Sequence, residues 1–269
     1  MSVGSLVFIG LGLYDEKDIS LKGIEEIKNS EFVFAEFYTA KLMGTKKEKI
    51  EKIFGKKIEI LDRYETEKGD KIIKTAKQKN VCFLTAGDPM TATTHIDLRI
   101  RAIKEGIKTQ VIHGSSIATA VPGLLGLQNY KFGRTTTLAY PEKDYFPTSP
   151  YEVIRDNKKI GLHTLVLLDI QDDKKRYMTA NEGMDLLLEM EEKYKDNIVT
   201  NESVICVVAR AGSTESEITA GMIKDLIKKD FGPPLHSLVI PGRLHFMEIE
   251  ALTVLAQLPA QLGEKLQKI

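Results

Sequence analysis

Short apolar runs alternate with segments of helical periodicity through the first half of the chain. The apolar runs have the length of buried strands and cover residues 6–9, 32–35, 58–61, 81–85 and 109–113. The segments between them with helical spacing cover residues 20–29, 46–54, 71–79 and 91–105. Ser20 is placed to cap the first of these helices. This alternation predicts a mostly parallel sheet with helices on both faces.

The pattern changes near His113. Residues 114–132 are rich in glycine, serine and other small residues, which predicts a connection that contains a short helix. Further strands are predicted at residues 135–140, 164–169, 203–209, 217–220 and 237–240, and further helices at 179–194, 221–229 and 244–255. Because these strands lie closer together in sequence, antiparallel pairing is expected. We therefore predict two α/β domains, residues 1–112 with a mostly parallel sheet and residues 113–269 with a mixed sheet.

Three glycine-containing loops follow predicted strands of the first domain. They cover residues 10–15, 87–90 and 113–116. In the second loop Gly87 lets the backbone approach a ligand and Pro89 directs the exit of the chain, although such a turn is common on its own. Loops at the carboxyl ends of parallel strands are where α/β sheets bind ligands. We expect the three loops to converge on one crevice suited to adenine, ribose and an amino-acid carboxylate.

Several other sites are disfavoured by local sequence. Asp15 stands where the third glycine of a dinucleotide fingerprint belongs, and neither a phosphate-binding Gly-Lys-Ser/Thr nor a nucleophile elbow is present. None of the five histidines has a partner at the spacing typical of helical metal sites. His95 and His245 are expected to pack or to lie on the surface. His236 follows a rigid Gly-Pro-Pro turn and is the best histidine for a ligand contact.

Composition narrows the partners and the compartment. Lys and Arg total 38, as do Asp and Glu, so the formal net charge is zero and the basic footprint of a nucleic-acid binder is missing. Cys82 and Cys206 stand in apolar runs and are expected to be buried, which fits a reducing compartment. Residues 1–6 do not resemble a signal peptide, and no apolar run approaches the ~20 residues of a membrane helix. We expect a soluble, cytoplasmic protein.

Ten short pieces of the chain together resemble one enzyme family. They are FIGLGLYD (residues 8–15), AEFYT (35–39), TAGDP (85–89), RIRA (99–102), FPTS (146–149), LHTL (162–165), MTANE (178–182), ARAGS (209–213), KDLI (224–227) and FGPPLH (231–236). In this order and spacing they resemble the class III, or tetrapyrrole-methylase-like, S-adenosylmethionine-dependent methyltransferases, and within them the diphthine synthase family of the archaeal type. The resemblance runs from Leu6 to about Leu255. Around Pro122 the chain holds one residue more than the family pattern.

The resemblance implies a fold, a reaction and a set of contacts. It implies two α/β domains with the methyl donor in the cleft between them, in a homodimer. It implies methylation, in the archaeal form to a trimethylammonium, of the amino group of a modified histidine on translation elongation factor 2 during diphthamide synthesis. S-adenosylhomocysteine would be the product of the donor, and no metal is required. The donor-contacting positions carried over are Leu13, Asp88, Thr91, Ser116, Ile117, Leu168, Ala211 and His236.

The sequence leaves parts of the mechanism and some alternatives open. It assigns no general base, and Asp88 is interpreted as a donor contact rather than a base. Tyr38, Tyr140 and Phe146 are candidate rings for a cationic product, with packing as the competing interpretation. The alternatives are a class III methyltransferase for a tetrapyrrole or RNA, an NAD-binding or nucleotide-sensing module, and a scaffold that uses helix 244–255. The first glycine loop lacks the continuation typical of corrin and porphyrin methylases, which counts against a tetrapyrrole.

Overall fold

The computed structural model describes residues 4–38, 40–143 and 145–267. Thr39 of the AEFYT piece and residues 1–3 of the N-terminal segment therefore lie outside the described residues. The chain forms two compact units, Met1–Ile117 and Ala118–Ile269. The sequence placed its domain boundary between residues 112 and 113, at the start of the same connection.

The first unit is built on an all-parallel sheet of five strands. The strands are β1 (Ser5–Gly10), β2 (Phe32–Glu36), β3 (Glu59–Ile60), β4 (Asn80–Thr85) and β5 (Lys108–Ile112). They lie in the order β3-β2-β4-β1-β5, and every pairing is parallel. The helices between them are α1 (Leu21–Asn29), α2 (Lys47–Phe54), α3 (Arg63–Lys68), α4 (Asp70–Ala76) and α5 (His95–Lys104). The predicted parallel sheet is confirmed.

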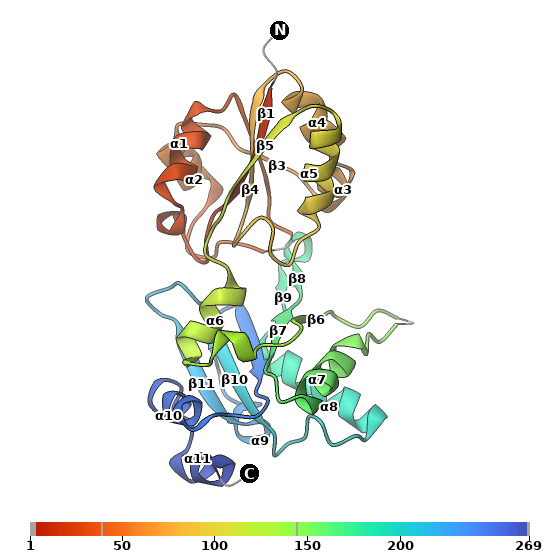
Figure 1. Cartoon of the computed structure of the whole chain (residues 1–269), viewed down its shortest axis with the longest axis vertical. Helices are drawn as coiled ribbons and strands as arrows, with labels where there is room; N and C mark the ends of the chain where they lie inside the picture. The colour runs from red at the N-terminus through yellow and green to blue at the C-terminus, as the bar shows by residue number, and fades with distance from the viewer. Residues whose placement is uncertain (1–3, 39, 144, 268–269) are drawn as a thin grey trace. The chain divides into compact units, whose positions relative to one another are not determined.

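Helices cover both faces of this sheet because its strands bury apolar side chains on both sides. On β1, Val7 and Ile9 pack into the core beneath α1 and α2, while Leu6 and Phe8 pack into the core beneath α4 and α5. Figure 1 shows α1 and α2 on one side of the sheet and α3, α4 and α5 on the other. Successive side chains of a strand point to opposite faces, so continuous apolar runs are the signature of a strand covered twice.

In this unit one helix was missed and the predicted start of another was wrong. Helix α3 was not predicted; it starts at a reciprocal cap between Asp62 and Glu65 and ends at Gly69, whose φ of 63° only glycine adopts at low cost. Helix α5 was predicted from residue 91 but begins at His95. The intervening residues form a turn in which the Thr93 hydroxyl donates to the carbonyl of Pro89. Side-chain bonds to the backbone of this kind compete with helix formation.

The second unit contains a mixed sheet. Its strands are β6 (Thr136–Leu138), β7 (Thr164–Leu168), β10 (Val204–Ala209), β11 (Glu217–Met222) and β12 (His236–Ile240), in the order β11-β10-β12-β7-β6. The β6–β7 pair is parallel and the other pairs are antiparallel. The predicted fold class, α/β with one mostly parallel and one mixed sheet, is confirmed. The predicted ligand cleft between the domains stays a prediction.

Helix α6 (Ile117–Leu125) begins with the last residue of the first unit and belongs otherwise to the second. The other helices of the second unit are α7 (Ser149–Lys159), α8 (Ala180–Tyr194), α9 (Ile223–Leu226), α10 (Phe246–Leu255) and α11 (Ala260–Gln267). A short hairpin joins β8 (Ile170–Gln171) to β9 (Arg176–Tyr177). Helices α7 and α11 and this hairpin were not predicted. The helix expected over residues 221–229 is only the short α9, because Gly221 and Met222 still pair with β10.

Both cysteines and one carboxylate lie deep in the protein. Cys82 and Cys206 are free and buried, as predicted, and burial raises the pKa of each thiol to about 12. Glu248 of α10 is fully buried, 3.0 Å from Nε2 of His163, and accepts from the N–H of Gln128 at 2.9 Å and from Lys131. Burial alone would raise the pKa of Glu248, but the bonds from the His245 N–H and from Lys131 lower it to about 2.

None of the described helices has the length and apolar composition needed to span a bilayer.

Candidate functional site

The three predicted loops of the first unit meet at one edge of its sheet. Strands β4, β1 and β5 are neighbours in that order, so their carboxyl ends lie side by side. Beyond the strands, the N–H of Gly87 donates to the carbonyl of Gly12 at 2.7 Å, and the N–H of Gly12 donates to the carbonyl of Gly87 at 3.3 Å. The predicted convergence of the loops is confirmed, and the ligand crevice that they are expected to line stays a prediction.

The loops pack backbone against backbone where they meet. A Cβ added to Gly114 would lie 2.4 Å from the carbonyl oxygen of Gly87 and 2.8 Å from the carbonyl carbon of Gly10. A Cβ added to Gly10 would in turn lie 2.5 Å from the amide nitrogen of Gly114. The glycines thus let the three loops pack main chain against main chain, with no room for a side chain between them.

Asp18 holds the first loop in shape. Its Oδ2 accepts from three successive backbone N–H groups, those of Leu13 at 3.2 Å, Tyr14 at 2.7 Å and Asp15 at 3.3 Å. A carboxylate that satisfies several amides in a row fixes the path of the chain. Sequence reasoning missed Asp18; the available signal was its position three residues after Asp15, the spacing of a reciprocal cap.

Asp88 ties the second loop to the third. Its Oδ1 accepts from the N–H of Met90 at 2.9 Å and from the hydroxyl of Thr91 at 3.3 Å. Its Oδ2 lies 2.7 Å from Nδ1 of His113, and the Asp88 side chain is only 8% exposed. The carboxylate is therefore occupied inside the chain, and we infer that Asp88 organises the loops rather than accepting a proton from a substrate.

A buried histidine contacts the main chain of the second loop. His95 is 3% exposed, and its Nδ1 lies 3.1 Å from the carbonyl oxygen of Pro89. Its ring meets Phe83 edge-on, and its Nε2 lies 3.6 Å from a carboxylate oxygen of the fully buried Glu36. Burial lowers the pKa of His95. His95 packs inside the unit, which is one of the two roles that the sequence predicted for it.

The remaining two positions carried over in the first unit are the last residue of the third loop and the residue directly after it. Ser116 is buried, and Ile117 is the first residue of α6. With Leu13, Asp88 and Thr91 they all belong to the three converging loops or to the residue directly after them. The structure thus gathers at one sheet edge the loops that carry five positions far apart in sequence.

The three positions carried over in the second unit also share one sheet edge. Leu168 is the last residue of β7, His236 is the first of β12, and Ala211 lies two residues after β10. His236 pairs with Ala209 on one side, and the antiparallel pairing of Ser237 with Leu167 brings Leu168 beside it on the other. These three positions therefore lie together.

Both ring nitrogens of His236 bind within the chain. Nδ1 accepts from the N–H of Ala180 at 3.1 Å, and Nε2 donates to the carbonyl of Pro233 at 3.1 Å. Burial lowers the pKa of His236, which favours this neutral form. The imidazole thereby joins the start of α8 to the turn before β12.

Each of the three candidate rings already has a cation over it. The guanidinium of Arg176 lies 3.4 Å from the centre of the Tyr140 ring. The guanidinium of Arg63 lies 5.1 Å from the centre of Tyr38, and Lys193 Nζ lies 5.8 Å from the centre of Phe146. The hydroxyl of Tyr140 also donates to Glu182 at 3.2 Å. Their electron-rich faces thus hold cations in this chain.

The sequence of this chain is similar to those of known proteins. The family model for Tetrapyrrole (Corrin/Porphyrin) Methylases matches residues 5–227. The chain is 54% identical over 251 residues to the diphthine synthase of Methanococcus maripaludis strain C5, an alignment that covers 93% of this chain and 98% of that protein. The chain belongs to the diphthine synthase family. It is also 54% identical over 255 residues to the family member from Methanocaldococcus jannaschii, with 94% of this chain and 99% of that protein covered.

The fold agrees with this family. A crystal structure of diphthine synthase superposes with a TM-score of 0.87 at 39% identity and covers 96% of this chain and 98% of that one. The predicted family, the methyltransferase activity and its role in diphthamide biosynthesis are confirmed, and the tetrapyrrole or RNA alternative is not favoured. Membership of this methyltransferase family implies the use of S-adenosylmethionine.

Proposed function

We propose that this chain transfers methyl groups from S-adenosylmethionine to the amino group of the modified histidine of translation elongation factor 2, to the trimethylammonium stage. The proposal is carried by the main-chain contacts that bring three glycine loops together at the carboxyl ends of the parallel strands. It is strengthened by identity of 54% with diphthine synthases over almost their full length.

We propose that all eight carried-over positions bind the donor. Leu13, Asp88, Thr91, Ser116 and Ile117 would contribute from the loops of the first unit, and Leu168, Ala211 and His236 from the sheet edge of the second. The residue types fit this ligand. Main-chain groups and hydroxyls suit the ribose and the amino-acid part of the donor, while the apolar side chains of Leu13, Ile117 and Leu168 suit adenine.

Methyl transfer requires the protein mainly to position the donor and the acceptor amine. The bound donor supplies a methyl group already activated by a positively charged sulfur, so transfer is an in-line displacement. The chain has to hold the unprotonated amine in line with the bond between the methyl carbon and the sulfur, and to exclude water. Because Tyr38, Tyr140 and Phe146 already face cations of this chain, we do not assign these rings to the cationic product.

We also propose a cytoplasmic homodimer that needs no metal and binds no nucleic acid. The dimer is supported by the apolar side chains that α10 leaves exposed: Phe246, Met247, Val254 and Leu255. Exposed apolar side chains in such number on one helix are typical of interfaces. Light scattering of the purified chain, compared with a Val254→Asp variant, tests this: a dimer that becomes a monomer is the expected result.

The deciding experiment is methyl transfer from labelled S-adenosylmethionine to elongation factor 2, with and without the aminocarboxypropyl group on its target histidine. Label only on the modified factor, with a mass increment of three methyl groups, is the expected result. A chain that binds the donor but labels neither form would overturn the proposed acceptor. If Asp88→Ala binds the donor normally yet fails in turnover, the assignment of Asp88 as a donor contact is wrong.

A further inference from the structure

Arg210 occupies an unfavourable backbone conformation at a corner of the second unit. It follows β10 directly and has a φ of 53°, in the left-handed region that favours glycine. For a residue with a side chain this conformation costs about 1–2 kcal/mol and persists only where the surroundings hold it. Its backbone N–H donates to the carbonyl of Leu235 at 2.8 Å.

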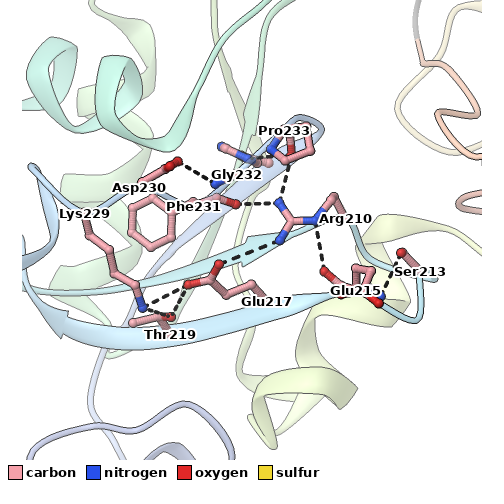
Figure 2. Close-up of polar contacts among 11 residues, drawn as sticks. Arg210, Ser213, Glu215, Glu217, Thr219, Lys229, Asp230, Phe231, Gly232 and Pro233 are labelled. Carbon is pink, nitrogen blue, oxygen red and sulfur yellow. Dashed lines mark hydrogen bonds and ion pairs between the residues drawn. The ribbon is translucent and has the colours of Figure 1, made fainter.

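The guanidinium of Arg210 joins two loops that are separate in sequence. Nε donates to the carbonyl of Glu215 at 2.9 Å, within the loop between β10 and β11. Nη1 donates to the carbonyls of Pro233, at 2.9 Å, and of Phe231, both in the turn that precedes β12. Figure 2 shows the side chain lying between the two loops with its nitrogens aimed at these carbonyls. Its side chain is only 11% exposed.

Neighbouring residues shape the seat of this guanidinium. Glu217 lies 3.7 Å from Nη2 and is itself paired with Lys229 at 2.9 Å (Figure 2). A Cβ added to Gly232 would lie 2.9 Å from Nη1, so the turn gives the guanidinium its space by having no side chain there. The N–H of Gly232 donates to Asp230 at 2.8 Å, which holds the turn in place.

These contacts bear on the donor site because of what each loop carries. Ala211 follows Arg210 directly, and His236 directly follows the turn that the guanidinium binds. We propose that Arg210 is a positioning residue for the methyl donor: it holds the loop of Ala211 and the turn before His236 in one arrangement without touching the donor. This inference rests on the proposed donor site. Lysine cannot replace it, because one ammonium cannot donate along the divergent directions of a planar guanidinium.

The test measures binding of S-adenosylhomocysteine by calorimetry to the full chain and to Arg210→Ala, Arg210→Gly and Arg210→Lys. We expect about 10- to 100-fold weaker binding in each, from the loss of several charge-assisted hydrogen bonds. Arg210→Gly relieves the backbone strain, so weak binding there assigns the effect to the guanidinium. Arg155→Ala is the matched control, since Arg155 pairs with Asp196 in the same unit and contacts neither loop.

Two further readouts separate positioning from damage to the fold. Millimolar guanidinium chloride should restore donor binding in Arg210→Ala, whereas a merely weakened fold would not recover binding, since this concentration is far too low to change stability. In methyl transfer, Arg210→Lys should raise KM for the donor and leave kcat near the wild-type value, whereas partial unfolding would lower kcat. The Lys variant also provides the test if the Ala variant does not fold.

The outcomes distinguish this inference from the proposed function. Wild-type chain that does not bind S-adenosylhomocysteine would overturn the donor site and the inference with it. Wild-type chain that binds, together with Arg210 variants of unchanged affinity, would overturn the inference alone. Weak binding without guanidinium rescue and with reduced kcat would likewise overturn it, because Arg210 would then be a general stabiliser of the unit.

Discussion

Replacement of Gly114 by alanine tests the packing of the three loops most directly. The new Cβ would lie 2.4 Å from the carbonyl oxygen of Gly87 and 2.8 Å from the carbonyl carbon of Gly10. These separations are about 1 Å short of ordinary van der Waals contact. Both neighbours are backbone, so neither can rotate away as a flexible side chain would. One of the loops has to move.

The cost of that movement can be worked from the contacts that hold Gly87. Its two hydrogen bonds with Gly12, at 2.7 and 3.3 Å, would stretch or break. Each is worth about 0.5–1.5 kcal/mol, and overpacking adds about 1–3 kcal/mol. We therefore expect Gly114→Ala to lower the free energy of unfolding of the first unit by about 2–6 kcal/mol and to weaken donor binding.

Two other glycines provide graded controls. Gly87 has a φ of 74° but open space around a new Cβ, so Gly87→Ala should cost only about 1–2 kcal/mol from the left-handed conformation. Gly123 is exposed in α6 with open space around it, so Gly123→Ala should stabilise the chain by about 0.5–1 kcal/mol.

Urea unfolding followed by circular dichroism, with calorimetric titration of S-adenosylhomocysteine, measures both effects. The expected order of stability is Gly123→Ala, wild type, Gly87→Ala and then Gly114→Ala. If Gly114→Ala unfolds within about 0.5 kcal/mol of the wild type, the loops do not pack backbone to backbone and the reasoning is refuted.

Three further predictions follow from single polar groups. Asp18→Asn replaces the carboxylate that binds three backbone N–H groups, and should lower the free energy of unfolding by about 1.5–3 kcal/mol and weaken donor binding. His236→Phe keeps a ring but leaves the buried Ala180 N–H without its acceptor and removes one of the two donors to the Pro233 carbonyl, which should cost about 1–3 kcal/mol in thermal or urea unfolding. The pKa of Glu248 is lowered from 4.5 to about 2. The ionised carboxylate therefore contributes about 3 kcal/mol to the free energy of unfolding above pH 4.5, and this contribution is lost as the pH falls toward 2. Glu248→Gln should be less stable than the wild type at pH 7, and its stability should depend less on pH between 4.5 and 2.

Each of these predictions has its own contradicting result. Exposed Lys17, beside Asp18, is the control for the first loop, and equal effects of Lys17→Ala and Asp18→Asn would argue against the amide contacts. A His236→Phe variant as stable as wild type would show that the imidazole bonds contribute little. If Glu248→Gln lost stability at acidic pH as steeply as the wild type does, other carboxylates would be responsible for that loss.

Much of the fold could be predicted because its signals are local. Strands β1 and β4 of the first unit are continuous apolar runs after their first residue, since a sheet covered on both faces buries the side chains of its central strands. The missed elements lack such a signal. Helix α3 (Arg63–Lys68) is short and polar, and it is recognisable only by its capping residues. The second unit required tertiary pairing to decide that residues 221 and 222 extend β11 instead of starting a helix.

The candidate site likewise has features that the sequence determined and features that only the tertiary structure decided. The sequence alone determined the alternation of strands and helices, the glycine loops after β1, β4 and β5 and the likeness to one enzyme family, because periodicity and turn residues act over a few neighbours. Only the tertiary structure decided which groups complete the loops. The His113–Asp88 pair and the Arg210 bonds to the turn before β12 join residues far apart in the chain. No local pattern encodes such pairs, because strand order and register bring their partners together only when the sheet forms.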